Sequence, residues 1–193
     1  MEDLLNQIAD FGDRAHGEQC RKYSPDRYMI HPIRVMKNCQ NYTDDISILA
    51  AALLHDVLED TPVSEQEIRI FLKGLLSEEQ TERALQLIVD LTDVYTKEAF
   101  PQLNRRTRKE KENDRMATIH PNAQTVKYAD IIDNTDEIVI HDPSFAKVFL
   151  HECQKNLKRM DQGNPDLYSV AKEKVDNALK NLKTKNYRNA NRI

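Results

Sequence analysis

The 193-residue chain carries 28 lysines and arginines against 32 aspartates and glutamates, a formal net charge of −4. Proteins that bind nucleic acids or anionic membranes through their overall charge are positively charged. The negative net charge of this chain therefore excludes that mode of binding. The charged fraction is high at 31%, the aromatic fraction is low at 6%, and there are only four glycines, a composition that favours long solvated helices over sheets. A chain of this length can bury the core of one domain.

The cysteines and the apolar segments of the sequence indicate in which cellular compartment the protein is expected. Cys20, Cys39 and Cys153 are scattered and lack metal-ligand spacing, so we expect reduced structural thiols. The amino-terminal stretch is acidic and amphipathic, without the apolar core of a signal peptide, and no apolar run reaches the length of a membrane span. We therefore expect a soluble, cytoplasmic protein with neither a membrane nor a nucleic acid as partner.

Two helices flanking a basic loop are predicted at the amino-terminal end. Apolar residues recur with helical spacing over residues 2–16, and Gly17 ends that helix. A basic, proline-containing loop follows over residues 19–28, long enough to be functional. The dipeptide His31-Pro32 then opens the second helix, since a proline in the first turn lacks only an N–H that would have no partner there.

The third predicted helix carries most of the ionisable groups of interest. We expect Thr43 or Asp44 to cap it, and it is filled by small and aliphatic residues from Ala50 to Leu54. The helix is expected to continue through His55-Asp56-Val57-Leu58-Glu59-Asp60. It stops before Pro62, because a proline disfavours helical geometry at the residue that precedes it.

Four ionisable side chains thus share the last turns of one apolar helix. At about 100° per residue, Asp56 and Asp60 lie on one face, as do His55 and Glu59. Carboxylates this close repel one another unless a cation lies among them, and acids are poorly placed near the negative end of a helix dipole. The pattern indicates a metal site with a spare acid or base. The alternative is a helix end whose acids face water.

The rest of the chain also has helical patterns and turn signals. Helices are expected over residues 64–73, 78–92, 104–117, 121–141, 144–160 and 166–183. No alternating strand, internal repeat or linker divides the chain. We therefore predict an all-α protein with one domain over residues 1–184, a bundle of about eight to ten helices, and a frayed tail over 185–193.

Two further residues extend the candidate metal site. His31 lies at a helix start, and Asp130 is an acid inside an otherwise apolar helical stripe. Either residue alone would more often be a hydrogen-bonded core residue. Together with His55 and Asp56 they form a set of two imidazoles and two carboxylates on three helices, the pattern of the HD-domain metal-dependent phosphohydrolases.

Four motifs give a closer resemblance. They are His16…Gln19-x-Arg21-Lys22, Tyr28-x-x-His31-Pro32-Ile33-x-Val35, Ala52-Leu53-Leu54-His55-Asp56-Val57-x-Glu59-Asp60-Thr61 and Val126-Lys127-x-Ala129-Asp130-x-x-x-Asn134. These motifs resemble the hydrolase domain of RelA/SpoT-type enzymes over roughly residues 5–140. With no synthetase or regulatory region, the chain is similar to the stand-alone small alarmone hydrolases. Those enzymes remove the 3′-pyrophosphate from (p)ppGpp.

The resemblance implies a metal centre and two catalytic acids. The centre would be one Mn²⁺ ion bound by His31, His55, Asp56 and Asp130, a donor set that suits a borderline-hard divalent ion. Open coordination positions would take a water molecule and a phosphate oxygen. Glu59 and Asp60 would be the catalytic acids, which take a proton from the attacking water or orient it.

The resemblance also implies side chains that hold a polyanionic nucleotide, the expected small-molecule partner. They are Arg21, Lys22, Asn134, Lys127, Arg105 and Arg108. The Arg21-Lys22 pair would hold the base or the phosphates, since arginine offers a bidentate fork, and Asn134 would contact ribose or phosphate. For the cations of the later helices, the alternative is a solvated charged face that contacts only water.

Two residues depart from the family pattern. Glu137 stands where long relatives often carry serine or threonine, and an acid near phosphates would weaken their binding. Tyr23 follows the Arg21-Lys22 pair where a small residue is common. Both leave the preference for guanine open. Of the other histidines, we expect His16 to pack or hydrogen-bond near the loop and His120 to cap a helix.

The function predicted from these residues is Mn²⁺-dependent hydrolysis of the 3′-pyrophosphate of (p)ppGpp or (p)ppApp. One alternative is an HD phosphohydrolase of another nucleotide, such as NADPH. A different class of function is a nucleotide-binding HD module without turnover, which has no need for Glu59 and Asp60 as acids outside the ligand set. The long amphipathic helices allow a monomer or a homodimer.

Overall fold

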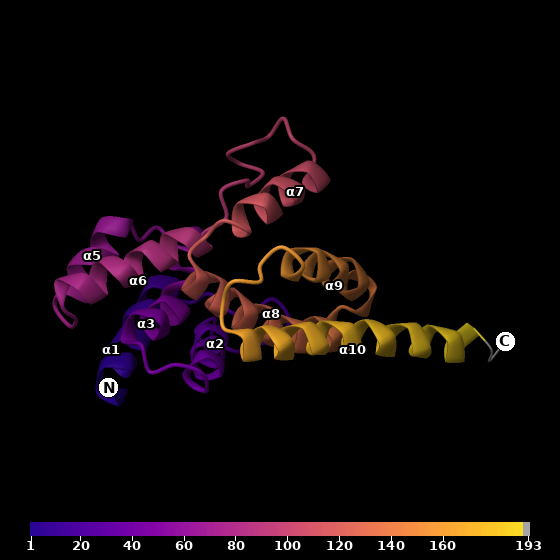
Figure 1. The fold of residues 1–193 in the computed structure, drawn as a ribbon, viewed down its shortest axis with the longest axis horizontal. Helices are drawn as coiled ribbons and strands as arrows, with labels where there is room; N and C mark the ends of the chain where they lie inside the picture. Colours follow the sequence, from indigo (N-terminus) through magenta and orange to yellow (C-terminus); the bar gives the residue numbers. More distant parts are fainter. Residues whose placement is uncertain (191–193) are drawn as a thin grey trace.

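The computed structural model describes residues 1–190, with the side chains described as far as residue 182. Over this part of the chain the regular structure is helical, apart from one isolated bridge between Cys20 and Arg27 (Figure 1). The helices are α1 (Glu2–His16), α2 (Ile30–Gln40), α3 (Ile46–Leu54), α4 (Val57–Asp60), α5 (Glu65–Lys73), α6 (Glu78–Leu91), α7 (Arg105–Met116), α8 (Pro121–His141), α9 (Pro143–Leu157) and α10 (Pro165–Ala190). The all-α prediction is confirmed.

Helix α3 lies at the centre of the amino-terminal half. All nine of its residues are buried, and it packs against α1, α2, α6 and α8. A helix that is apolar all round must lie inside the core, because no side of it gains from contact with water. The end of α3 therefore delivers His55 and Asp56 into the interior of the molecule.

Helix α8 joins the two halves of the bundle. One part of it contacts α2, α3 and α6, and it also packs against α9 and α10 (Figure 1). Twelve of its residues are buried, among them Asp130 and Asp133. Because α8 crosses α2, these acids lie beside the residues at the start of α2.

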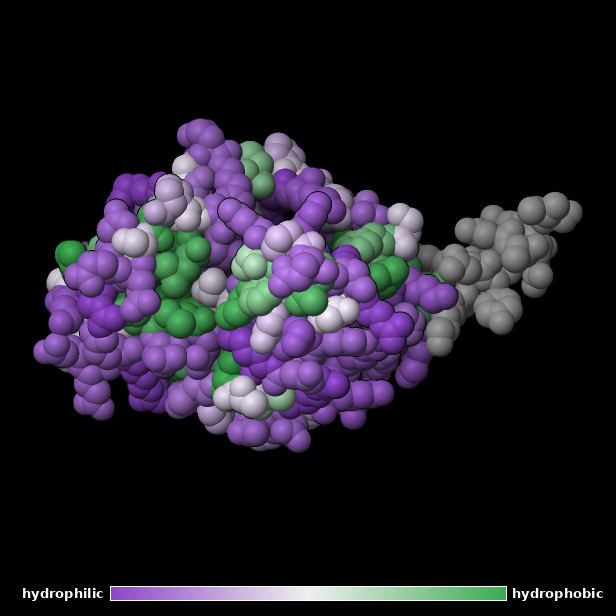
Figure 2. Space-filling view, turned by 90° about the horizontal axis from the view of Figure 1, so that it is seen from above, coloured by the Kyte–Doolittle hydropathy of each residue, from purple (hydrophilic) through white to green (hydrophobic). Residues whose placement is uncertain are grey.

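Helix α7 and the segment before it project from the body of the bundle (Figure 1). Only Glu112 and Met116 of α7 are buried, and the helix packs against α9. Figure 2 shows a face that is mostly hydrophilic, with hydrophobic patches between polar side chains. Over the described residues, no helix is both long and apolar enough to cross a membrane.

Two details of the predicted helices are corrected. Asp45 caps α3, since its carboxylate accepts the Ser47 N–H at 2.9 Å, so the prediction of Thr43 or Asp44 is wrong. Thr43 instead accepts the backbone N–H of Asp45 at 3.1 Å. The reason is the backbone of Asp45, which is extended directly before the first helical residue.

The predicted continuous helix through Asp60 is also wrong. Helix α3 ends at Leu54, His55 and Asp56 form a turn, and α4 is a single turn. The His55 ring donates from Nδ1 to the Ala52 carbonyl at 2.9 Å, which satisfies an acceptor at the end of α3. The ionisable residues therefore lie on two short segments with different directions, and the predicted shared faces do not apply.

The predicted domain boundary at residue 184 lies within α10, which extends to Ala190. Residues 191–193, the end of the predicted tail over 185–193, lie outside the described residues. The tail stays a prediction.

Candidate metal and phosphate site

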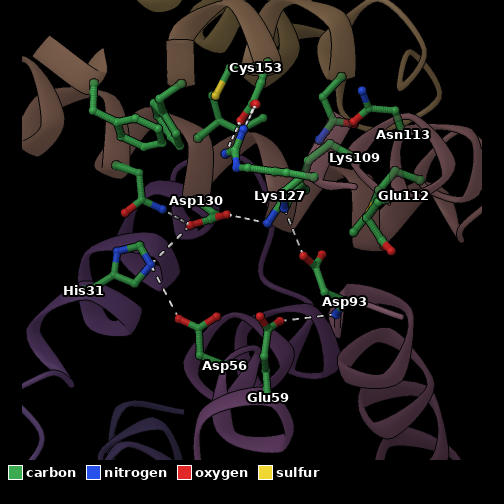
Figure 3. A pocket seen from close by; sticks show the side chains of 18 of the residues that line it. His31, Asp56, Glu59, Asp93, Lys109, Glu112, Asn113, Lys127, Asp130 and Cys153 are labelled. Carbon is green, nitrogen blue, oxygen red and sulfur yellow. Dashed lines mark hydrogen bonds and ion pairs between the residues drawn. The ribbon is translucent and has the colours of Figure 1, made fainter. Parts of the chain in front are cut away.

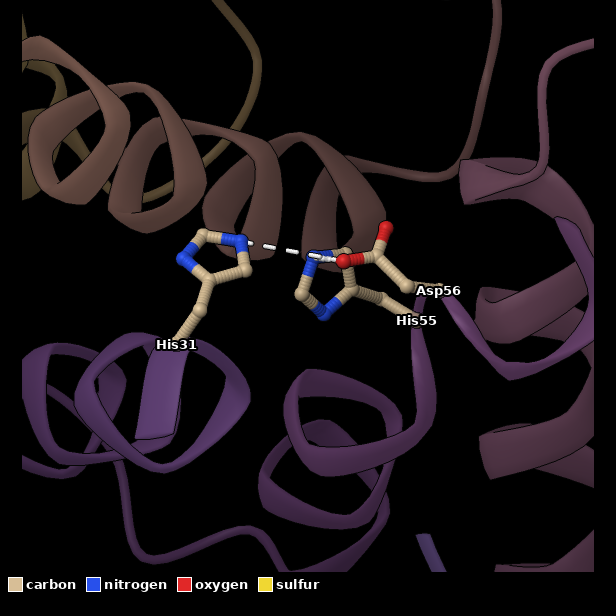
Figure 4. A group of neighbouring side chains, drawn as sticks. All are labelled: His31, His55 and Asp56. Atoms are coloured by element: carbon tan, nitrogen blue, oxygen red, sulfur yellow. Dashed lines mark ion pairs between the residues drawn. The ribbon is translucent and has the colours of Figure 1, made fainter. Parts of the chain in front are cut away.

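Three predicted metal ligands meet where α2 begins and α3 ends. The ligand atoms of His31, His55 and Asp56 all lie within 4.8 Å of one another (Figure 4). The His55 Nε2 atom is 3.1 Å from Asp56 Oδ2, and the His31 Nε2 atom is 3.7 Å from the same oxygen. The two ring nitrogens and the carboxylate thus face a common point.

Asp130 reaches the same point from α8 (Figure 3). Its Oδ1 atom lies 3.2 Å from His31 Nε2 and 3.9 Å from His55 Nε2. The structure thus brings together the four predicted ligands from three different segments. We call these residues (His31, His55, Asp56 and Asp130) the metal cluster.

Both histidines are oriented through their second nitrogen. The Nδ1 atom of His31 is 2.6 Å from Asp133 Oδ2, and that of His55 is 2.9 Å from the Ala52 carbonyl. In the neutral form of each ring, Nδ1 is the donor to its oxygen partner, and the lone pair of Nε2 is then directed at the common point. Among the described residues, the buried His55 Nε2 atom makes no hydrogen bond of good geometry, although Asp56 Oδ2 lies 3.1 Å away. Two neutral imidazoles and two carboxylates in this arrangement fit a divalent metal ion.

The electrostatics of the metal cluster favour a cation. Burial disfavours the charged form of His31, but the carboxylates of Asp130, Asp133 and Asp56 outweigh it and raise the pKa of His31 to about 9. Burial acts against the ionised form of Asp130 too, yet Lys127 and the two histidines hold its pKa well below the usual range. Positive charge is thus stabilised at this point, whether a proton or a metal ion brings it.

A cavity of about 270 Å³ opens over the metal cluster (Figure 3). We call it the first cavity. Its charged and amide-bearing lining residues are His31, Asp56, Glu59, Asp93, Arg105, Lys109, Glu112, Asn113, Lys127, Asp130, Asn134, Glu152 and Asn156. The cavity therefore combines three residues of the metal cluster (His31, Asp56 and Asp130) with three cations and several acids.

The two predicted catalytic acids lie differently. Glu59 lines the first cavity and accepts the Asp93 N–H at 3.2 Å through Oε2. Partial desolvation raises the pKa of Glu59, and so does the carboxylate of Asp93. Asp60 is exposed and lies outside the lining of the first cavity, with the Gln19 amide 3.4 Å from its Oδ2 atom. Glu59 alone of the pair faces the metal cluster.

Each cation of the first cavity has an acidic partner. The Lys127 Nζ atom is 2.7 Å from Asp130 Oδ2, and the Lys109 Nζ atom is 3.1 Å from Asp93 Oδ2. Arg105 pairs with Glu152 through both ends of its guanidinium group. An incoming phosphate would compete with these carboxylates for the cations.

The predicted cation Arg108 lies elsewhere. Its Nη1 atom donates to the Leu103 carbonyl, and Arg108 is not among the residues that line the first cavity. Lys109, which the sequence prediction left out, lines the cavity instead. Arg108 and Lys109 stand three and four residues after Arg105, separations that both share a face with it, so the spacing alone does not distinguish them.

A second cavity of about 280 Å³ adjoins the first. Both are lined by Tyr28, Asn134, Phe145 and Phe149, and the second is further lined by Arg21, Lys22, Tyr23, Glu137 and Ile138. Arg21 and Lys22, the predicted cations of the loop, thus line the second cavity together with residues near the end of α8. The shared lining residues place the two cavities side by side, between the metal cluster and the loop over residues 19–28.

Arg21 is held in the second cavity by two residues of α8. Its guanidinium group donates to Glu137 Oε2 at 2.6 Å and to Asn134 Oδ1 at 3.1 Å. It also lies over the Tyr28 ring, 5.4 Å from the centroid. The acid at position 137 is therefore neutralised by a cation, so its charge is not left open to a phosphate.

The remaining predictions near the loop are confirmed. His16 bonds to Gln19 at 2.9 Å and stacks on the Tyr28 ring at 4.4 Å. His120 caps α8 by accepting the Asn122 N–H at 3.0 Å. Neither ring takes part in the metal cluster.

Comparisons with known proteins agree with this geometry. Residues 28–135, which include all four residues of the metal cluster, match the HD domain. The chain belongs to the HD domain family. The HD domain of this chain resembles the human guanosine-3′,5′-bis(diphosphate) 3′-pyrophosphohydrolase MESH1, with 32% identity over 69% of each chain.

Other relatives of this HD domain point the same way. A probable guanosine-3′,5′-bis(diphosphate) 3′-pyrophosphohydrolase of Mycoplasma pneumoniae is 27% identical over 96% of the chain. The chain spans about a quarter of the length of this relative and of its counterpart in Mycoplasma genitalium. It is thus homologous over most of its length to proteins named as 3′-pyrophosphohydrolases.

Solved structures support the fold. A metazoan orthologue of SpoT, described as hydrolysing ppGpp, superposes with a TM-score of 0.73 at 22% identity and covers 92% of this chain and 94% of its own. A Listeria monocytogenes protein superposes with a TM-score of 0.58 at 19% identity, covering 78% and 94%. Both likenesses establish the helical fold of the HD domain.

Sequence reasoning missed Asp133 as well as Lys109. Asp133 stands inside the motif around Asp130, one helical turn further along α8. It could have been found from its position, because it is an acid three residues after a predicted metal ligand in a buried helical stripe. A buried acid needs a hydrogen-bond donor nearby. His31 and Arg34 supply the donors at 2.6 Å each.

Proposed function

We propose that this HD domain hydrolyses the 3′-pyrophosphate of (p)ppGpp with water bound to a divalent metal ion. The observation that carries the proposal is the first cavity, where the metal cluster, an acid outside the ligand set and three cations face one another. The names of the relatives supply the substrate class. The site is built from one chain, so it is complete in a monomer and in a homodimer.

The metal cluster would hold the ion through two imidazole nitrogens and two carboxylate oxygens. We propose Mn²⁺, because this mixed set suits a borderline-hard ion with open coordination positions. When bound, such an ion lowers the pKa of a water ligand and offsets negative charge on phosphate oxygens. The chain contributes the orientation of both rings through Asp133 and the Ala52 carbonyl.

Glu59 is the proposed general base. Its Oε2 atom is occupied by the Asp93 N–H, which leaves Oε1 to accept the proton of the attacking water. The raised pKa of Glu59 makes it a stronger base than an ordinary carboxylate. Asp60 is proposed as a second acid that acts from beside Tyr28.

The bonds broken and formed follow from the substrate. Water adds to the phosphorus atom joined to O3′, and the bond between that phosphorus and O3′ breaks. The 3′-oxygen takes up a proton, so the products are inorganic pyrophosphate and a nucleotide with a free 3′-hydroxyl group. The proton that Glu59 removes from water balances the one that the leaving oxygen gains.

The two cavities divide the substrate between them. The 3′-pyrophosphate would lie in the first cavity, where Arg105, Lys109 and Lys127 exchange carboxylate partners for phosphate oxygens. The nucleoside would lie in the second cavity against Arg21 and the aromatic side chains. Asn134 lines both and would contact the ribose between them.

Turnover assays test the proposal. Purified protein is incubated with Mn²⁺ and ppGpp, with ppApp and NADPH as parallel substrates, and pyrophosphate and phosphate are measured separately. Pyrophosphate release from ppGpp that stops with a chelator supports the proposal, and faster release from ppApp moves the base preference to adenine. Phosphate release from NADPH alone, or no turnover of any substrate with metal bound, would overturn it.

A further inference from the structure

A chain of charged side chains links the two cavities beneath their common lining. His31 Nδ1 bonds to Asp133 Oδ2 at 2.6 Å, and Arg34 donates to both oxygens of Asp133, at 2.6 Å from Nε and 3.1 Å from Nη2. The same Nη2 atom of Arg34 donates to Glu137 Oε1. Glu137 in turn holds Arg21 at 2.6 Å. The metal cluster and the second cavity are thus connected without a gap.

Helical spacing explains the order of this chain. His31 and Arg34 are three residues apart on α2, and Asp133 and Glu137 are four apart on α8. Residues at these separations share a helix face, so the two pairs meet where α2 packs against α8. We call Asp133, Arg34 and Glu137 the α2–α8 bridge.

The inner end of the α2–α8 bridge is buried, so its polar atoms need partners within the protein. Asp133 is 6% exposed and His31 1% exposed, so a loss of their bond would leave polar atoms without water or partner. The carboxylate of Asp133 accepts hydrogen bonds from His31 and from two nitrogens of Arg34, so it serves as an anionic acceptor for the ring. An anionic acceptor both fixes the His31 ring and makes its Nε2 atom a stronger donor to a metal.

The two histidines differ in this respect. His55 donates to a neutral backbone carbonyl within its own segment, and that bond depends on no distant side chain. His31 donates to a carboxylate whose other bonds come from Arg34, and Arg34 also holds Glu137. The orientation of His31 is therefore tied to groups that line the second cavity.

We propose that the α2–α8 bridge positions the metal ligand His31 and ties it to Arg21, so that the metal cluster and the second cavity are organised as one unit. Asp133, Arg34 and Glu137 are positioning residues in this proposal, since each acts through His31 or Arg21. The inference rests on the proposed function for its role in turnover. Its test needs only the metal.

The test is calorimetric titration of nucleotide-free, metal-stripped protein with Mn²⁺. Asp133→Ala is expected to weaken binding about 10- to 100-fold, the usual effect of removing a carboxylate behind a ligating histidine. Asp133→Asn keeps a neutral acceptor and is expected to fall between Asp133→Ala and the wild type. Equal affinity of wild type and Asp133→Ala would overturn the proposal.

Asp136→Asn is the matched control for charge. Asp136 lies on the same helix, is 59% exposed at its side chain and pairs with Lys174, away from the bridge. Its substitution removes one negative charge from α8 and is expected to leave the affinity for Mn²⁺ unchanged within twofold. An effect as large as that of Asp133→Asn would overturn the positioning role, because general electrostatics would then explain both.

The outer end of the bridge is tested by a double-mutant cycle. Glu137→Gln is expected to weaken Mn²⁺ binding more than Asp136→Asn does, and the double variant with Asp133→Asn is expected to bind no more weakly than Asp133→Asn alone. Additive losses would overturn the linkage. Arg34→Met changes a side chain that is 40% exposed, so the fold is expected to survive. Unchanged Mn²⁺ affinity in this variant would overturn the bridge.

The outcomes separate this inference from the proposed function. Wild-type protein that binds no divalent ion overturns the proposed function and the bridge with it. Wild-type protein that binds Mn²⁺, with bridge variants that bind equally well, overturns the bridge alone. Circular dichroism of each metal-free variant shows that a weakened affinity does not come from unfolding.

Discussion

The two sides of the first cavity hold their charged groups in different ways. On one side, which we call the floor, α2 and α8 supply His31 and Asp130, and the adjoining end of α3 carries His55. All three are at most 5% exposed. On the other side, which we call the wall, α7 supplies Arg105 and Lys109, whose side chains are 49% and 44% exposed, and α9 supplies Glu152. The floor is part of the core, and the wall lies at the surface.

The difference separates two tasks of the site. Floor residues have fixed partners in the core, so their donor atoms are already arranged for a metal ion. Wall cations are paired with Glu152 and Asp93 and are accessible to water, where ion pairs contribute about 0–1 kcal/mol. They can change partners at little cost. A rigid floor and an exchangeable wall suit a small fixed ion and a large flexible polyphosphate.

The largest effect is expected from a change in the floor. Asp56→Ala removes the carboxylate that lies 3.1 Å from His55 Nε2, so both Mn²⁺ binding and turnover should fall below detection. Calorimetry and pyrophosphate release measure the two. Asp44→Ala is the control, since Asp44 is an exposed acid of the same region that does not cap α3. Normal turnover by Asp56→Ala would remove Asp56 from the metal cluster.

A change at Glu59 should separate binding from chemistry. Glu59→Gln keeps the shape and the bond from the Asp93 N–H but cannot accept a proton. We expect kcat to fall about 10²- to 10⁴-fold while the affinity for Mn²⁺ stays near the wild-type value. Steady-state kinetics and calorimetry on one preparation give both values. A kcat near that of the wild type would show that Glu59 is not the base.

The wall should give a smaller effect of a different kind. Lys109→Met removes a cation that binds substrate and transition state alike, so KM should rise about tenfold with little change in kcat. The increase should shrink at high salt, because exposed charges are screened. Arg106→Met is the control on the same helix, where the Arg106 side chain is 88% exposed and pairs with Glu110. A fall in kcat without a rise in KM would contradict the assignment.

The smallest expected effect is a difference in the labelling rates of cysteine thiols. This difference compares how readily the floor and the wall open. Burial raises the pKa of Cys39, on α2, and of Cys153, which lines the first cavity, to about 12 in each case. The two thiols therefore have similar intrinsic reactivity, and a difference in labelling rate reports local opening. We expect the exposed Cys20 to react first, then Cys153, then Cys39. Faster labelling of Cys39 than of Cys153 would mean that the floor opens more readily than the wall.

Much of the floor could be predicted from the sequence, because its residues stand in short motifs with fixed spacing. The helices themselves followed from apolar periodicity. The break after Leu54 did not, since it depends on a side-chain bond from His55 back to Ala52 that no spacing rule contains. Asp133 was missed for a related reason: its importance comes from α2 packing against α8, which brings His31 and Arg34 to it.

The wall was predicted less well. Its basic helix gave several cations and no apolar stripe to fix the face that turns inward. Arg108 and Lys109 are neighbours in the sequence, yet only Lys109 lines the first cavity. The pairing of each cation with an acid could not be predicted either, because Glu152 lies on α9, far along the chain from Arg105.

The arrangement of α8 also limits which insertions and deletions the protein can tolerate. Asp130, Asp133, Asn134 and Glu137 stand within about two turns of one helix, and together they contact His31, Arg34 and Arg21. One inserted residue would turn everything after it by about 100°, so a length change between positions 130 and 137 would misplace several groups at once. Residues 96–102, which lie outside any helix and after Asp93, carry no such register. Variation in length among functional descendants of this chain should therefore collect there, while substitutions at constant length are the only route to change along α8.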